Sequence, residues 1–225
     1  MTTDTKTATV TLPASVWLAA LDTCKATCAD GRDGRDGRAN LTAVSVRIVD
    51  GRVTFAGADG FALVRVTVDE TPAEGNGDYL IGTVDEAYSP FKTAISLLKV
   101  AAKDQANIPV TFTDKAAEMI IGATRITIPL LDATYPRYEE LIPAIQPDAT
   151  ISHIAMDANL IGGILAIASK YGRKTSRKGT IARFRFTEDR SPARIDWNGN
   201  GWHATAAVMP MFVDWTGDAD ALGDR

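Results

Sequence analysis

The stretch from Ser89 to Lys103 holds three lysines and no acidic residue. Its pattern predicts a helix in which Lys92, Ser96, Lys99 and Lys103 lie in line on one face, because residues at i, i+4, i+7 and i+11 share a helix side. Solvated helices normally mix both signs of charge. A purely basic stripe therefore suggests a surface that contacts a polyanion, although a merely solvated face is the alternative.

A second basic segment, KYGRKTSRK, places five positive charges in nine residues without an acid: Lys170, Arg173, Lys174, Arg177 and Lys178. The chain carries a net charge of -4, so removing these five charges leaves -9 elsewhere. Such segregation favours local binding of phosphates while the overall charge discourages non-specific association. No aromatic residues interleave the basic positions of the 89–103 helix, which favours contact with a duplex backbone over stacking on single-stranded bases.

The segment DGRDGRDGR (residues 30–38) carries an arginine at every third position. A calcium loop is rejected, because Arg32, Arg35 and Arg38 stand where oxygen ligands would be needed and no distal Glu completes the loop. Two interpretations stay open: a solvated loop, or a flexible arm whose arginines contact phosphate.

Signals for enzymatic chemistry are poor. The sequence holds no GxxxxGK[ST], HExxH, CxxC or GxSxG motif, and its two histidines, His153 and His203, are scattered. Asp59 and Asp132 are assigned to turns rather than to acid–base roles. We therefore predict that the protein is not an enzyme and uses neither a metal nor another cofactor.

The two cysteines, Cys24 and Cys28, are four residues apart, which places them on one helix face, where we expect them to fill a core rather than form a disulfide. The longest apolar run, LIGGILAIAS, is much shorter than a membrane span, and no secretory signal is visible at the N-terminus. These features predict a cytoplasmic protein without a membrane partner.

Periodicity predicts an α+β fold with an internal repeat of a strand, a helix and an antiparallel meander. We expect helices from Pro13 to about Cys28, with Trp17, Leu21, Cys24 and Cys28 on its buried face, from Ser89 to Lys103 and over 159–171. Alternation and tight turns at Asp50-Gly51, 58–60 and WNGNGW predict the strands. The predicted strands cover residues 8–12, 44–48, 53–55, 63–68, 79–82, 108–114, 116–122, 124–131, 151–157, 180–188, 193–197 and 202–213.

Three segments together carry a resemblance to a known family. RVTFAGADGFALVRV resembles the strand–ATDG–strand segment of bacterial DNA sliding clamps, the β subunit of the replicative polymerase. LLDATYPRYEELIP is similar to the DGxFPDYxxxxP stretch that closes the family's middle domain, and VMPMFV is similar to its C-terminal VMPM strand. The order and spacing of the three segments also match.

The resemblance implies a clamp fold with sheets outside and helices inside. It divides the chain into a complete, middle-type clamp domain (1–145), the second half of a last domain (146–216) and an acidic, disordered tail (217–225). A first domain and half of the last are absent, which suggests a reduced clamp of phage or mobile-element origin. If a ring keeps the family's twelve inner helices, four chains would be needed; alternatively, the half domain pairs with that of a partner chain, or no ring forms.

The resemblance also implies a function: a homo-oligomeric ring that encircles duplex DNA without reading its sequence and tethers a polymerase and a clamp loader through a peptide pocket. Lys25, which lies off the buried face of the first helix, joins the two basic segments and the three loop arginines as DNA-binding candidates. The alternative is a clamp-fold interaction module that forms no ring and regulates replication or transcription proteins.

Carried over by position, the pocket comprises three groups of residues: Leu41, Ala58, Gly60, Phe61 and Leu63; Pro136 and Leu141; and Ala207, Val208, Met209, Pro210 and Met211. Apolar side chains and adaptable methionines suit a short hydrophobic peptide. Leu63, Val208 and Met209 can equally be core residues. Ala58, Ala62, Glu140 and Phe212 depart from the family pattern and make the expected pocket less basic than usual.

Overall fold

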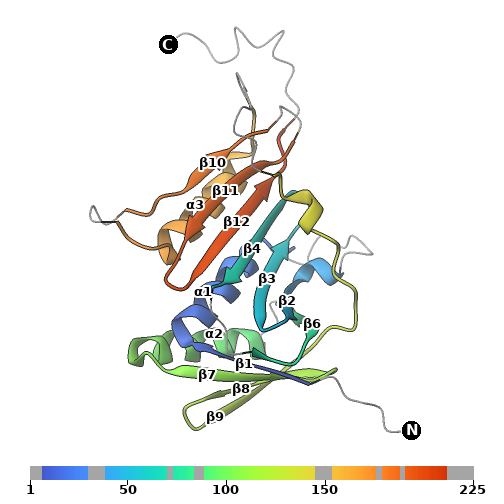
Figure 1. Ribbon diagram of the computed structural model, residues 1–225, viewed down its shortest axis with the longest axis vertical. Coiled ribbons are helices and arrows are strands. Elements are labelled where there is room, and N and C mark those ends of the chain that lie inside the picture. Colours follow the sequence, from blue (N-terminus) through green and yellow to red (C-terminus); the bar gives the residue numbers. More distant parts are fainter. Residues whose placement is uncertain are drawn as a thin grey trace.

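The computed structural model describes residues 7–29, 39–69, 73–83, 89–144, 154–175, 179–187 and 191–211. Its elements form three consecutive units, each with a helix followed by three antiparallel strands (Figure 1). The first unit is β1 (Ala8–Pro13), α1 (Ala14–Lys25), β2 (Ala43–Val49), β3 (Arg52–Ala58) and β4 (Ala62–Val68). The second is β6 (Gly77–Gly82), α2 (Pro90–Ala101), β7 (Asn107–Phe112), β8 (Ala116–Ile121) and β9 (Thr124–Pro129). The third is α3 (Ala158–Tyr171), β10 (Arg183–Arg185), β11 (Ala193–Asn198) and β12 (Trp202–Val208).

The first two units exchange their first strands. β1 pairs with β7 of the second unit, and β6 pairs with β2 of the first. This gives a five-stranded sheet in the order β5-β1-β7-β8-β9, where β5 is the short strand Ala73–Glu74, and a seven-stranded sheet in the order β10-β11-β12-β4-β3-β2-β6. The third unit joins the larger sheet because β12 pairs with β4, from Trp202 opposite Val68 to Val208 opposite Ala62.

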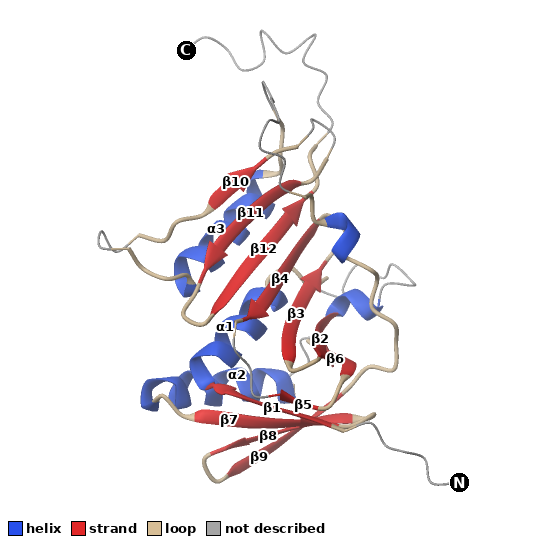
Figure 2. Ribbon diagram, viewed as in Figure 1, coloured by secondary structure: helices blue, strands red, loops and turns tan. Residues whose placement is uncertain are grey.

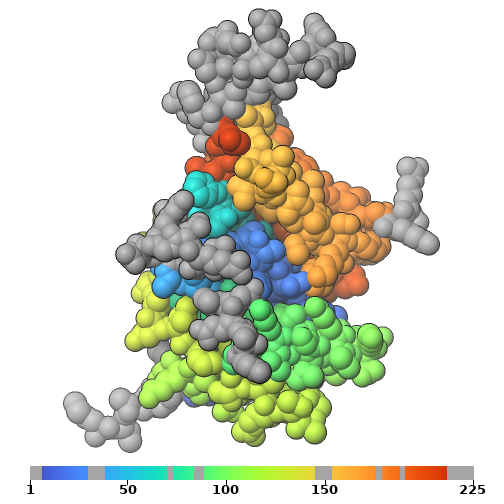
Figure 3. Space-filling view, turned by 180° about the vertical axis from the view of Figure 1, so that it is seen from behind, coloured from blue at the N-terminus to red at the C-terminus, as the bar shows by residue number. Residues whose placement is uncertain are grey.

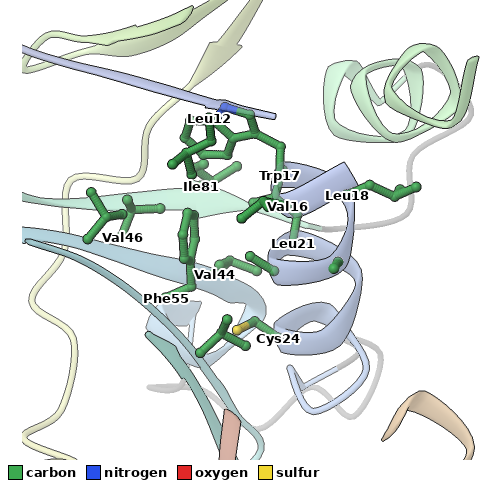
Figure 4. Packing of buried hydrophobic residues seen from close by; sticks show 14 of the residues in the cluster. Leu12, Val16, Trp17, Leu18, Leu21, Cys24, Val44, Val46, Phe55 and Ile81 are labelled. Carbon is green, nitrogen blue, oxygen red and sulfur yellow. The ribbon is translucent and has the colours of Figure 1, made fainter. Parts of the chain in front are cut away.

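The α-helices cover one face of this arrangement, and no α-helix among the described residues lies on the other face of the seven-stranded sheet (Figure 2). Strand alternation directs Val53 and Phe55 inward to the helices. Trp17 of α1 packs edge-on against Phe55, with ring centroids 5.4 Å apart (Figure 4). Its indole N–H donates a hydrogen bond to the Ile108 carbonyl at 2.9 Å. Most of the buried hydrophobic residues of the three units form one continuous cluster.

A glycine sets the close approach of α1 to the sheet. A Cβ atom added at Gly57 in β3 would lie 1.9 Å from the carbonyl oxygen of Cys24, so no larger residue fits without displacing the helix. Cys24 is buried and Cys28 partly buried, and both are free thiols, as the sequence predicts. Burial raises the pKa of Cys28 to about 12, which makes it an unreactive thiol.

Most predicted elements are confirmed, with three corrections. The first helix begins at Ala14 and ends at Lys25, because Pro13 still belongs to β1. The strand predicted over 180–188 is only Arg183–Arg185, at the edge of the sheet. Of the strand predicted over 151–157, residues 151–153 lie outside the described ranges, and Ala155 forms only an isolated bridge to Met211.

Helix starts differ in how they are capped. Ser89 occupies the N-cap position of α2, but its side chain makes no capping hydrogen bond. At α3 the Asp157 carboxylate accepts hydrogen bonds from the amides of Asn159 (2.7 Å) and Leu160 (3.1 Å). The local sequence therefore fixes both starts, one through Pro90 at the first turn and one through an acidic cap.

Within the described residues, no helix combines the length and apolar character needed to cross a bilayer. The same residues contain no group of three His, Cys, Asp or Glu side chains placed to hold a metal ion.

Candidate nucleic-acid and peptide interfaces

The basic stripe of α2 lies on the side of the helix away from the core. Phe91, Ile95 and Leu98 are buried, whereas Lys92, Lys99 and the following Lys103 are exposed. Seen from behind, α1, α2 and α3 lie together on one face of the molecule (Figure 3). The stripe therefore belongs to a surface made by all three helices.

Asp22 of α1 connects the three helices electrostatically. Its carboxylate accepts hydrogen bonds from Lys170 Nζ at 2.8 Å and from Tyr171 Oη at 2.5 Å, both at the end of α3. Lys99 of α2 is also close enough to act on its charge. Lys99 and Lys170, which are far apart in sequence, thus lie around the same carboxylate.

The pKa of Asp22 is lowered by these neighbouring groups. Burial by itself raises the pKa, but the hydrogen bonds from Lys170 and Tyr171, with the charges of Lys170 and Lys99, bring it below the ordinary value of 3.8. Burial and the bond to Asp22 raise the pKa of Tyr171 to about 12. The carboxylate is therefore ionised and the phenol neutral at physiological pH, and part of the Lys170 charge is compensated inside the protein.

The remaining predicted basic residues differ in their exposure and in their contacts. Lys25 is half-buried, with its ammonium 5.8 Å from the centre of the Phe91 ring. Arg173 is exposed, while Lys174 donates to the Ser169 carbonyl and to Thr180 Oγ1. The other predicted bases lie outside the described residues: Arg32, Arg35, Arg38, Arg177 and Lys178.

One base was missed by the sequence reasoning. Exposed Arg183 of β10 lines the same open cleft as Arg173 and Lys174. Its neighbour Arg185 is held by Asp196 at 2.7 Å. The alternation in RFR could have marked Arg183 as a side chain on the polar face of a strand.

The predicted peptide pocket begins at the turn between β3 and β4. Asp59 Oδ1 accepts hydrogen bonds from the amides of Phe61 and Ala62, both at 2.8 Å, and Gly60 has a φ of +99° that favours glycine. The amide of Met209, just after β12, donates to the Phe61 carbonyl at 2.9 Å. The turn and the end of β12 are therefore held side by side, and Asp59 has the turn role predicted for it.

A small apolar cluster, the outer cluster, lies on the face of the seven-stranded sheet opposite the helices. Its buried members are Ala56, Leu63, Tyr138 and Ala207, and Ala58, Tyr135 and Ile142 pack around them. Leu63 and Ala207 are directly opposite each other in the β4–β12 pair. The structure thus brings residues from the three predicted pocket segments together.

Side-chain exposure divides the predicted pocket residues. Phe61 is 55% exposed and Met209 45% exposed, and Leu141 and Met211 are also large exposed apolar residues. Val208 is fully buried against the helices, because successive strand residues face opposite sides of the sheet. Pro136 is exposed, Gly60 is exposed, Pro210 is half-buried, and Leu41 is buried outside the cluster in the 3-10 helix Ala39–Thr42.

The two tyrosines of YPRYEELIP, which the sequence analysis did not select, are central to the outer cluster. Their rings pack edge to face with centroids 5.9 Å apart. Burial raises the pKa of Tyr138 to about 12 and that of Tyr135 still further. Their aromatic character was the available signal, since large rings usually supply the buried area of a surface cluster.

The basic helix layer and the outer cluster both lie on a fold that is shared with known proteins. The chain has the fold of bacterial DNA polymerase sliding clamps. The Pseudomonas aeruginosa sliding clamp superimposes with a TM-score of 0.62 at 12% identity, covering 91% of this chain and 66% of the clamp. The Bacillus subtilis clamp gives 0.61 at 14% identity, covering 92% and 64%. The Thermotoga maritima DNA polymerase III β subunit gives 0.55 at 14% identity, covering 92% and 66%.

The sequence itself matches no protein-family model and no curated protein. The chain spans about two thirds of the length of the clamps that it resembles. The α+β clamp fold expected from three short motifs is confirmed.

Proposed function

We propose that the protein is a reduced sliding clamp that binds duplex DNA without sequence specificity and tethers a partner protein, with no catalytic activity of its own. The observation that carries the proposal is the charge of the helix layer. α1, α2 and α3 contain one acid, Asp22, and its charge is already compensated by Lys170. α2 itself therefore contributes Lys92 and Lys99 and no acidic residue to this layer.

The geometry supports contact with the DNA backbone rather than with bases. The α2 lysines are exposed side chains on a rigid helix, with no aromatic side chain between them on that face. Such an arrangement neutralises phosphates as a duplex passes and carries no sequence information. In this proposal the chain forms a closed homo-oligomer and the helix layer is its inner wall.

The test compares DNA retention by the wild type and by the triple variant Lys92→Glu, Lys99→Glu, Lys103→Glu. We expect the variant to lose retention on circular duplex, and the slope of log affinity against log salt to fall by about one per lysine. Arg52→Glu, on the outer face of the sheet, is the matched charge reversal and should retain DNA. Equal retention by the wild type and the triple variant would remove the inner-wall assignment.

A second function, an interaction module that forms no ring, is favoured by one observation. Phe61, Met209, Met211 and Leu141 expose large apolar side chains near the outer cluster, which suits a peptide anchor whether or not a ring closes. Mass photometry at micromolar concentration separates the two functions, because a protein that remains monomeric cannot encircle DNA.

A further inference from the structure

Arg65 is a charged residue of β4 on the outer face of the seven-stranded sheet, the face that carries the outer cluster. It lies directly opposite Ala56 of β3, a member of that cluster, and opposite Thr205 of β12 on its other side (Figure 1). Leu63, another member, stands two residues before Arg65 and therefore points to the same side of the sheet. Arg65 is thus an immediate neighbour of the outer cluster.

The guanidinium of Arg65 forms no ion pair with an acid among the described residues. The side chain is half-buried, and its Nε atom is buried without a hydrogen-bond partner there. Arg47 on β2 differs, because its Nη1 donates to Glu139 at 2.7 Å and its Nε lies 3.5 Å from Asp78. A cation that is partly removed from water and has no counter-charge favours an incoming anion more than an exposed cation does.

Arg65 also lines an open cleft on the outer face. Residues of β2, β3 and β4 form the cleft together with Tyr138 and Glu139, which follow β9. Tyr138 belongs to the outer cluster as well, so the cluster and the cleft adjoin. Burial raises the pKa of Tyr138 to about 12, and the charge of Arg65 counteracts part of this rise, which indicates that the guanidinium lies near the phenol.

The strands set the spacing between an apolar anchor and this charge. Side chains two residues apart on a strand point to the same side and lie roughly 7 Å apart. An extended peptide has the same rise per residue, so a ligand that covers Leu63 reaches Arg65 with the side chain about two positions further along. The exposed Phe61 precedes Arg65 by four residues and extends the range to about four positions.

We infer that Arg65 binds the carboxylate of an Asp or Glu side chain in the tethered partner, two to four residues from the apolar anchor that the outer cluster receives. A guanidinium suits this role, because its donors pair with both oxygens of one carboxylate. DNA is a poorer ligand here, since its backbone offers no apolar group to the cluster and Asp50 and Glu139 in the cleft would repel a row of phosphates. The inference rests on the peptide tethering in the proposed function and names the class of peptide.

The first test compares two C-terminally amidated peptides that share Leu and Phe anchors and differ only in Glu or Gln at the third position from the anchor. The wild type should bind the Glu peptide about five- to tenfold more tightly, as measured by fluorescence polarisation. Arg65→Gln should abolish this preference, because only the Glu peptide loses an ion pair. Circular dichroism and the melting curve check that the variant is folded. Amidation removes the terminal carboxylate as an alternative partner of Arg65.

Arg52→Gln is the matched control, because Arg52 lines the same cleft and the substitution removes the same charge. Its Cα atom lies four residues along β3 from Ala56, roughly 13 Å away, which exceeds the Debye length of about 8 Å at physiological salt. Most of the preference for Glu should therefore remain. An equal loss in Arg52→Gln and Arg65→Gln would reduce the effect to general surface charge and overturn the inference.

The second test reverses the charges. Arg65→Glu should prefer a peptide with Lys in place of Glu, whereas Arg65→Lys should keep part of the wild-type preference, because an ammonium lacks the planar pair of donors. A wild type that binds the Glu and Gln peptides equally would contradict the inference and leave peptide tethering intact. Absence of binding by either peptide would remove tethering and the inference together. A fall in DNA retention by Arg65→Gln without any peptide preference would assign Arg65 to DNA instead.

Discussion

Asp22 is the one acidic side chain within the three α-helices, and its contacts show how a residue can limit a binding surface. By accepting hydrogen bonds from Lys170 and Tyr171, it ties the end of α3 to α1 and withdraws one positive charge from the helix layer. Lys170, which the local charge pattern selects as a DNA-binding candidate, is thus partly neutralised by a carboxylate of the protein itself. The α2 lysines are the stronger candidates for phosphate contact.

Replacing Asp22 by Asn should lower the free energy of unfolding by about 1 kcal/mol near neutral pH, because a charge-assisted bond to a half-exposed lysine is lost. The folded-state pKa of Asp22 lies below the ordinary 3.8, so its contribution is present above that pH and is lost as the pH falls through the lowered pKa. Urea unfolding at several pH values checks this. The difference between wild type and Asp22→Asn should shrink in acid, whereas exposed Asp104→Asn should have little effect at any pH.

At the scale of elements, the outer cluster combines residues of three strands, β3, β4 and β12, with the segment that follows β9 of the second unit. Its buried members hold the segments together, and the exposed side chains of Phe61 and Met209 lie two residues from its members Leu63 and Ala207. Leu63 is a poor probe of peptide binding because it is buried, and Leu63→Ala should cost about 2–4 kcal/mol of stability. Phe61 and Met209 are better probes.

The double variant Phe61→Ser, Met209→Ser should weaken binding of a short peptide with Leu and Phe anchors by about tenfold or more, because exposed apolar anchors dominate such contacts. Fluorescence polarisation measures the affinity, and the melting temperature should stay close to that of the wild type. Ile120→Ser, an exposed apolar position on the five-stranded sheet, is the matched control. Equal peptide affinity in all three proteins would exclude this surface as the anchor.

For the whole molecule, the pairing of β12 with β4 makes the third unit continuous with the first. One cluster of buried residues runs through all three units, so the boundary near residue 145 expected from the resemblance does not interrupt the core. The third unit has little core of its own, because α3 buries only two residues completely.

Calorimetry should accordingly show a single cooperative unfolding transition, with the third unit melting together with the rest. Fluorescence of Trp197 and Trp202 in the third unit, measured in variants that retain only these tryptophans, should follow the same curve as backbone circular dichroism. Two resolved transitions would mean that the third unit is an independent domain despite the shared sheet.

The sequence alone determined the parts of this protein that depend on near neighbours. Alternation indicates the buried faces of β2 and β3. Asp50-Gly51 indicates the turn between these two strands and Asn200-Gly201 the turn between β11 and β12, and the φ values at Asp50, Gly51 and Gly201 are positive. The lysine stripe was also visible, because residues at i, i+4, i+7 and i+11 lie on one side of a helix. Three short motifs then sufficed to indicate the clamp fold.

Only the tertiary structure decided which of those side chains are buried or paired within the protein and which are exposed to solvent. The pairing of Lys170 with Asp22 joins residues 148 positions apart, and Tyr138 is buried by strands from two other units. Leu160, Ile164, Ile167 and Tyr171 recur at helical spacing in α3, but only Ile164 among them is fully buried, because among the described residues α3 packs against α1 less extensively than α2 does. Whether a side chain is buried depends on which residues pack against it. Where those residues are distant in the sequence, no local pattern identifies them.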